Sequence, residues 1–238
     1  MATKRFAIRM LLLVLIATGL ACTVYSNLRL AGLREVHDDL RMRVGIFEEA
    51  DPAKVRVVRA GVPEDLIASG INDSKVWRYR ISLPAKYHLC CENHEGLVKA
   101  DAPGGASSYS RNWVGPNSEP SEIMFSVSFI KDHGQWTLSV IHTGGSSGFH
   151  VPQDFPISSP EKLVIDEVVD FGVTRSFDPD EAICLLRIRE KDEAHNRDGT
   201  KKQGLYRGFG FYMFEDKNKE AFSAWTNGEI SSMQEMKK

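Results

Sequence analysis

The sequence predicts a mainly β protein of the α+β class, with a transmembrane helix and a helical stalk before an antiparallel, sandwich-like β-rich domain. Three observations predict this class. Residues 10–25 form an apolar run without charge, the pattern changes from helical to alternating near residue 55, and no long helices alternate with strands. Alternation of strands with long helices would indicate a parallel doubly wound sheet, so its absence favours antiparallel pairing.

The apolar run predicts a membrane span. Residues 10–25 read MLLLVLIATGLACTVY. A helix that crosses a bilayer needs about 20 apolar residues. Residues 6–8, together with snorkelling of the Arg9 side chain to the headgroups, bring the run to that length. We therefore expect residues 10–26 to form a transmembrane helix that contacts the lipid bilayer.

Two other fates of this segment stay open. A basic start and a short apolar core also fit a secretory signal peptide, for which Gly19-Leu20-Ala21 resembles a small-residue cleavage site. Lipoprotein processing at Cys22 is a further alternative. That signal usually has leucine three residues before the cysteine, and Gly19 stands there instead.

Residues 27–50 are expected to form a helical stalk. No proline occurs between residues 26 and 49, and a polar residue, His37, fills one position of an apolar 3-4 pattern. The stalk either packs on its own domain or forms the seam of a homo-oligomer. The apolar positions of the pattern are Leu30, Leu33, Leu40, Val44 and Phe47.

The flanking charges predict the orientation. Lys4, Arg5 and Arg9 precede the run without an acidic residue. Because basic flanks stay in the cytoplasm, residues 1–9 are expected to be a cytoplasmic tail. Residues 51–238 are then an extracytoplasmic domain of a single-pass protein of the cell membrane.

The composition limits the classes of partner that the chain can bind. The chain has 238 residues, a net charge of −2 and a pI near 6.4, with 42% hydrophobic and 26% charged residues. These values describe an ordinary globular protein, and they argue against a nucleic-acid partner, which needs a basic surface. Unknown proteins of the cell envelope are the partners that we expect.

Alternating patterns predict the strands. Residues 77–83 read WRYRISL, with the apolar side chains on one face, and Pro84 ends this strand. Residues 123–130 and 135–142 predict a hairpin, because the Lys131–Gly134 connection offers an aspartate and a glycine for the turn. Further expected elements are strands at 87–91, 162–171, 182–190 and 206–214, a turn-rich connection at 196–204, a helix at 217–225, and loops at 92–121 and 144–160.

Residues 144–148 match G-x-S-x-G, the pattern of a hydrolase nucleophile elbow. That motif needs a helix directly after the serine, Ser146. Pro152 and Pro156 follow instead, so we interpret the stretch as a flexible loop. An envelope hydrolase that uses Ser146 and His150 remains the alternative hypothesis.

Residues 207–214 read RGFGFYMF and match, at every position but Tyr212, the aromatic strand with which RNA-recognition domains stack bases. Those domains need an aromatic partner strand, and the candidate at residues 182–190 contains no aromatic residue. We therefore expect a core strand of a hairpin.

Residue types that can bind a metal ion occur close together at His88, Cys90, Cys91 and His94. In a strand, His88 and Cys90 face one side and Cys91 the other, so only part of the set can converge. A metal-dependent enzyme that uses this His88–His94 neighbourhood stays an alternative, as does a disulfide between Cys184 and one of the adjacent cysteines.

Carboxylate clusters are interpreted as solvated faces, and the sequence assigns no catalytic, cofactor-binding or metal-ligating residue. The clusters are Glu92/Glu95, Asp166/Glu167/Asp170 and Asp178/Asp180/Glu181. We therefore expect a non-enzymatic protein with a binding or scaffolding domain and no cofactor.

Several stretches carry a resemblance to a known family: LRE at 33–35, DPAKV at 51–55, WRYRISLP at 77–84, LC at 89–90, LLRIR at 185–189 and GFGFYMF at 208–214. With the apolar N-terminal run, they make the chain similar to uncharacterised single-pass membrane proteins with an extracytoplasmic domain, common in planctomycete bacteria. The resemblance covers most of the chain. It implies no established activity and no site residue, and it supports a hairpin strand at 208–214.

Overall fold

The computed structural model describes residues 18–20, 22–34, 36–37, 39–40, 44–47, 51–62, 75–104 and 108–233. The chain divides into two compact units, Met1–Arg43 and Val44–Lys238. Every described residue of the first unit is helical. Most of the predicted span, residues 10–17 and 21, lies outside the described residues.

Among the helices formed by the described residues, none is both long and apolar enough to cross a bilayer.

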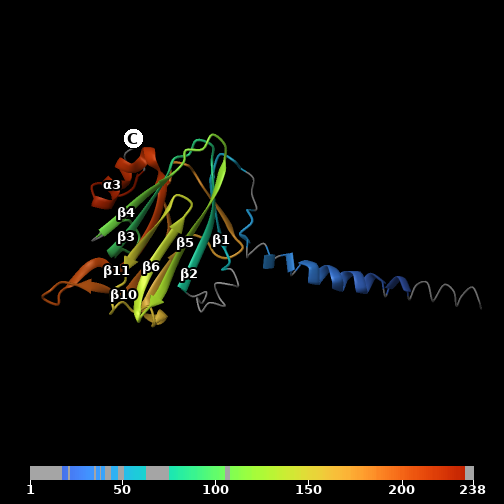
Figure 1. Ribbon diagram of the computed structural model, residues 1–238, viewed down its shortest axis with the longest axis horizontal. Coiled ribbons are helices and arrows are strands. Elements are labelled where there is room, and N and C mark those ends of the chain that lie inside the picture. The colour runs from blue at the N-terminus through green and yellow to red at the C-terminus, as the bar shows by residue number, and fades with distance from the viewer. Residues whose placement is uncertain are drawn as a thin grey trace, which may run out of the picture. The chain divides into compact units, whose positions relative to one another are not determined.

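The second unit is built from two antiparallel sheets (Figure 1). The first sheet has the order β7-β6-β5-β2-β1-β9, and the second has the order β4-β3-β11-β10-β8. The first contains β1 (Val55–Ala60), β2 (Val76–Leu83), β5 (Ser121–Asp132), β6 (Gln135–His142), β7 (Gly145–His150) and β9 (Thr174–Phe177). The second contains β3 (Leu89–Lys99), β4 (Ser108–Val114), β8 (Leu163–Glu167), β10 (Ile183–His195) and β11 (Lys201–Glu215).

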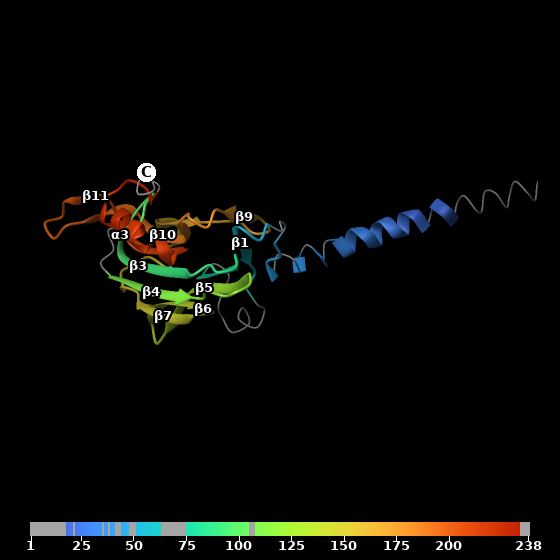
Figure 2. The same cartoon turned by 90° about the horizontal axis from the view of Figure 1, so that it is seen from above.

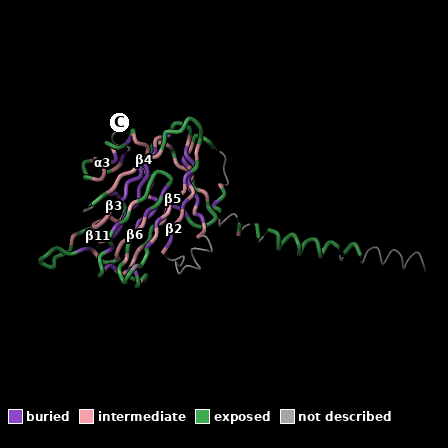
Figure 3. The backbone as a smooth tube through the Cα atoms, viewed as in Figure 1, coloured by how far each residue is buried: buried purple, intermediate pink, exposed green. Residues whose placement is uncertain are grey.

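The two sheets pack face to face as two layers, with β6 and β7 in one and β10 and β11 in the other (Figure 2). Buried residues run along the strands of both sheets (Figure 3). The core between the sheets takes the apolar face of each strand, because period-2 alternation places those side chains on one side. The predicted antiparallel β-rich domain is therefore confirmed.

A second, smaller core lies on the other face of the second sheet. There α3 (Lys219–Asn227), which follows the 3-10 turn η3 (Asp216–Asn218), packs its Phe222 ring on Phe214 at 4.2 Å between ring centroids. Gly228, at φ 77°, ends the helix in a left-handed conformation that glycine adopts without steric cost. Cys90 and Tyr212 are buried under this helix.

Several predicted elements agree closely with the structure. The apolar side chains of β2 face the core, and Pro84 follows its last residue. Strands β5 and β6 form the predicted hairpin, with Asp132 paired to Gln135. The two residues between them, His133 and Gly134, have φ values of 46° and 84°, as a tight hairpin turn requires. The connection between β10 and β11 is also a hairpin, and residues 217–225 overlap α3.

Two predicted loops were wrong. Residues 92–121 contain most of β3, which also extends the short strand predicted at 87–91, and all of β4. Residues 144–160 contain β7, and β9 was not predicted. The polar residues of β3 give no strand pattern, because Glu92 and His94 are buried under α3 instead of facing solvent. Burial on both faces removes the alternation on which strand prediction rests.

Candidate ligand-binding site

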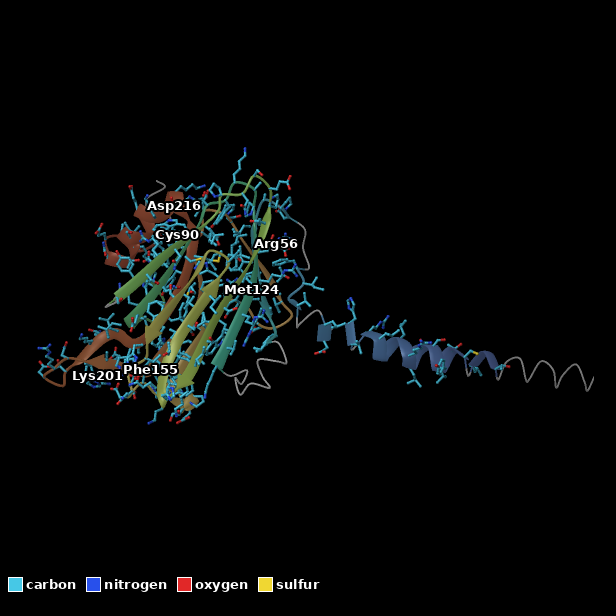
Figure 4. All side chains as sticks on the ribbon, viewed as in Figure 1. Arg56, Cys90, Met124, Phe155, Lys201 and Asp216 are labelled. Carbon is cyan, nitrogen blue, oxygen red and sulfur yellow. The ribbon has the colours of Figure 1, made fainter. Side chains whose placement is uncertain are left out.

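One end of the sandwich is covered by the crossover segment, residues 151–162, which connects β7 of the first sheet to β8 of the second. Its last three residues form the 3-10 turn η2 (Pro160–Lys162). Phe155 of this segment lies at the end of the sandwich away from Asp216 (Figure 4). We call this end the crossover end.

A row of aromatic rings lies behind the crossover segment. Trp77 contacts Phe129 at 6.0 Å between ring centroids, and Phe129 contacts Phe209 at 5.9 Å. Phe209 in turn contacts Phe155 at 5.3 Å. All three pairs meet edge to face, the geometry that the ring quadrupoles favour. The row joins both sheets to the crossover segment, and its rings line two cavities.

The first of these, the apolar cavity, has a volume of about 290 Å³. Trp77 and Phe129 line it from the first sheet, and Ile188 lines it from the second. Lys75 is the one charged side chain among the described residues that line it. The lysine ammonium also lies 4.2 Å from the centre of the Trp136 ring, a cation–π contact that holds it beside the cavity.

The second, the Glu95 cavity, has a volume of about 210 Å³ and lies between β3, β11 and the crossover segment. Glu95 lies opposite Phe209 in the pairing of β3 with β11, and both residues line the cavity. Phe155 and Arg207 also line it. Burial raises the pKa of the Glu95 carboxyl above its ordinary value.

Arg207 is held by a carboxylate outside the cavity. Its two terminal nitrogens donate to Asp154 at 2.7 and 2.8 Å, a bidentate pair. This hydrogen bonding raises the pKa of Arg207 and lowers that of Asp154. Nε of Arg207 also lies 3.7 Å from Glu190.

A third and larger cavity, of about 740 Å³, is lined by Asp178, Asp180, Glu181 and Trp225. Two of its three acidic side chains have basic partners, because Lys54 lies 3.8 Å from Asp178 and Lys217 lies 3.0 Å from Asp180. These ion pairs account for Asp178 and Asp180 of the predicted carboxylate cluster, and we do not treat the cavity as the ligand site.

The one buried constellation of acid, base and cation lies beneath α3 in the part of the chain that the structure describes. Glu92 hydrogen bonds with His94 Nε2 at 2.7 Å and accepts from Arg111 Nε at 2.6 Å. Burial alone would raise the pKa of Glu92, but hydrogen bonds from His94 and Arg111 hold it below its usual range. The His94 and Glu92 side chains are only 1% and 4% exposed, so no ligand reaches them while α3 is in place. The prediction that Glu92 lies on a solvated face was therefore wrong.

Ser146 and His150 do not come together. Both lie on β7, four residues apart, so about 13 Å of extended strand separates their backbones. Ser146 pairs with Ile141, whose side chain is 54% exposed, on the outer face. Gly144 is explained by packing instead, because a Cβ there would lie 2.8 Å from the carbonyl oxygen of Trp113. The motif is the start of a hairpin strand.

The candidate metal ligands between His88 and His94 do not come together either. Cys90 belongs to the core under α3 and Cys91 to the core between the sheets, as alternation predicted. His88 Nδ1 lies 3.6 Å from Asp216, away from the pair that His94 makes. Within the described residues, no group of three His, Cys, Asp or Glu side chains could hold a metal ion.

The cysteines are free thiols. Burial raises the pKa of Cys90 and of Cys91 to about 12 each, so neither is a reactive thiolate. Cys184 is unpaired and accepts a weak hydrogen bond from Arg187 at 3.8 Å.

The strand that resembles an RNA platform is the centre of the second sheet. β11 lies between β3 and β10, with Phe209 and Phe211 in the core between the sheets. Tyr212 and Phe214 are covered by α3 on the other face. Because both faces are covered, these rings cannot stack on bases, and the hairpin strand expected from the sequence is confirmed.

Fold and site together define an antiparallel two-sheet sandwich with two small cavities at one end. No family model, curated protein or solved structure matches the chain. Sequence reasoning missed the cavity residues Lys75, Phe155 and Arg207. It places Glu95 on a solvated face, because the strand pairing that sets this residue against Phe209 leaves no local pattern.

Proposed function

We propose that the chain is a membrane-attached protein of the cell envelope whose sandwich binds a small amphipathic ligand at the crossover end, without catalysis. The apolar cavity carries this proposal. Its walls suit an apolar chain or ring, and Lys75 at its lining suits an anionic group on the same molecule. A volume of about 290 Å³ fits a short chain rather than a long lipid.

Membrane attachment is supported by the first unit. Its helical residues expose large apolar side chains, such as Leu20 at 63%, Val24 at 58% and Leu28 at 69%. The Thr23 hydroxyl donates to the Gly19 carbonyl oxygen at 2.8 Å, which satisfies its polar group within the helix. Residues 10–26 then cross the bilayer, with residues 1–9 in the cytoplasm and the sandwich outside.

Self-association through residues 27–50 belongs to the same proposal. Leu30, Leu33 and Leu40 are 47%, 60% and 53% exposed at helical 3-4 spacing. An apolar stripe of this kind suits a second copy of the helix.

Carbonate extraction of membranes tests attachment. We expect the full-length chain to stay in the pellet. A full-length product in the supernatant would refute retention. A product about 2 kDa lighter would indicate removal of about 20 residues, the length of a signal peptide.

Fluorescence quenching tests the ligand. The full chain in phosphatidylcholine nanodiscs is titrated with 10-bromodecanoate, whose bromine quenches tryptophan on contact, with lipid-only nanodiscs as the blank. We expect saturable quenching that Trp77→Phe lowers and Trp113→Phe retains, because Trp77 lines the cavity and Trp113 does not. Equal quenching in the two variants, or none in the wild type, would contradict the proposal.

A matched pair of variants tests whether the ligand carries an anionic group. Lys75 and Lys131 both contact the Trp136 ring, at 4.2 and 5.6 Å, but only Lys75 lines the cavity. Lys75→Met is expected to weaken bromodecanoate binding at least threefold and Lys131→Met to leave it unchanged. The same loss in both variants would show only a general charge effect.

A further inference from the structure

The Glu95 cavity contains one carboxylate among the described residues of its lining. Glu95 is half-buried, and its side chain forms no hydrogen bond or ion pair with any residue that the structure describes. His150 acts on it only through its charge at longer range. An ionised group in an apolar cavity without a partner is unfavourable, so the site favours a cation that enters from outside.

The nearest basic wall residue does not fill this role. Arg207 lines the cavity, but its guanidinium is bound to Asp154 in a bidentate pair and lies beside Glu190. Asp154 and Glu190, which lie outside the lining, therefore neutralise the Arg207 guanidinium, and Glu95 is the carboxylate of the described lining that remains for a cation.

The remaining walls select an organic cation over a metal ion. A metal ion needs several oxygen, nitrogen or sulfur ligands, and Glu95 is the one carboxylate that lines the cavity among the described residues. Phe155 and Phe209 instead offer aromatic rings, which attract ammonium groups. Gly96 and Gly208 lie opposite each other and contribute only backbone, which leaves room for an apolar stem.

We propose that the Glu95 cavity binds a primary ammonium group on a short apolar stem, with Glu95 as its counter-ion and Phe155 and Phe209 as its walls. A volume of about 210 Å³ fits a butylammonium-sized group. This chemistry belongs both to free alkylamines and to lysine side chains of a protein. The cavity is separate from the apolar cavity, so the inference does not depend on the proposed function.

Saturation-transfer NMR on the full chain in phosphatidylcholine nanodiscs tests the inference, with empty nanodiscs as the blank. The probes are butylammonium, Nα-acetyl-lysine methylamide and the neutral 1-butanol. We expect saturable binding of both ammonium probes and at least tenfold weaker binding of the alcohol. If only butylammonium binds, the site takes free amines; if the lysine derivative binds more tightly, it takes protein side chains.

The isosteric variant Glu95→Gln removes the charge and is expected to lower ammonium affinity at least tenfold. Glu119→Gln, at an exposed position away from the cavity, makes the same change in net charge and should leave affinity unaltered. Equal loss in both variants, unchanged affinity in Glu95→Gln, or absent binding in the wild type would each overturn the inference. Amide spectra that match the wild type show that each variant is folded.

Discussion

Arg59 and Glu167 form an ion pair that joins the two sheets, with Arg59 Nη1 2.8 Å from Glu167 Oε1. The side chains are 14% and 19% exposed. The Tyr79 hydroxyl donates to the same carboxylate at 3.3 Å, and the Arg59 guanidinium lies 3.8 Å from the centre of the Phe171 ring. Burial raises the pKa of Glu167 more than the nearby Arg59 lowers it.

Removal of Arg59 is therefore expected to be more harmful than neutralisation of Glu167. Arg59→Met leaves a half-buried carboxylate without its cation and should lower the free energy of unfolding by about 2–3 kcal/mol at pH 7. Glu167→Gln keeps the shape and removes the charge that burial disfavours, so its cost should be less than half of this. Urea denaturation measures both, and equal costs would contradict this account.

The loss of stability in Arg59→Met should depend on pH in a defined direction. Because the pKa of Glu167 is raised in the folded state, its protonated form favours folding, and that contribution is lost as the pH rises above the ordinary value of 4.5. Loss of Arg59 raises this pKa further. The deficit of Arg59→Met against the wild type should therefore shrink as the pH is lowered from 7 toward 4.5, and a constant deficit would exclude Glu167 as its cause.

Phe222 holds α3 on the second sheet and covers Cys90. Phe222→Ala removes a buried ring, which usually costs about 3–5 kcal/mol, and should release the helix. Alkylation followed by mass spectrometry should show faster modification of Cys90, while Cys91 stays protected in the core between the sheets. Glu220→Ala, an exposed change in the same helix, is the control. Equal modification of both cysteines would indicate global unfolding instead.

Gly134 is required by the turn between β5 and β6. Its φ of 84° strains any residue with a Cβ, and no atom lies within 4 Å of the position that a Cβ would take, so strain alone decides the effect of Gly134→Ala. We expect a loss of about 1 kcal/mol in thermal or urea unfolding. Gly148→Ala also meets open space but has no such φ, and it should be neutral. Equal effects would refute the role of the turn.

Ammonium binding at Glu95 should fail in acid. The carboxylate must be ionised to pair with the cation, and burial raises its pKa above 4.5, so affinity should begin to fall at a pH above that value. Among the described residues, Arg207 from β11 lines this site and His150 from β7 acts on Glu95 through its charge. Glu190 from β10 and Asp154 from the crossover segment are the carboxylates that contact Arg207. His150→Gln removes the histidine, and a pH profile that this variant abolishes would assign the effect to His150.

The elements that the sequence predicts have local causes, and those that it misses depend on residues distant in the chain. The faces of β2 are predictable because alternation and Pro84 are local signals, and the β5–β6 hairpin is predictable because its turn residues are adjacent. The polar half of β3 is not. Its Glu92 and His94 are buried only because α3, which is distant in sequence, lies over them. No local sequence pattern predicts this burial.

The candidate site is beyond sequence reasoning for the same reason. Lys75, Glu95 and Arg207 come from three strands or their ends, and Phe155 comes from a segment whose sequence indicates a loop. Each of the three charged residues by itself is typical of a solvated surface. The convergence of Glu95, Arg207 and Phe155 at one cavity depends on the pairing of β3 with β11 and on the path of the crossover segment, and Lys75 lies at the other cavity.

The sequence by itself determined the antiparallel β class, the faces of its clearest strands, its principal hairpins and the short C-terminal helix. These follow from side-chain periodicity and turn chemistry, which act over a few residues. Only the tertiary structure decided which polar groups are buried and paired: Glu92 contacts His94 and Arg111, whereas Glu95, three residues along the same strand, has no partner among the residues that the structure describes. That difference arises because α3 covers one face of β3, while the other opens to a cavity at the crossover end.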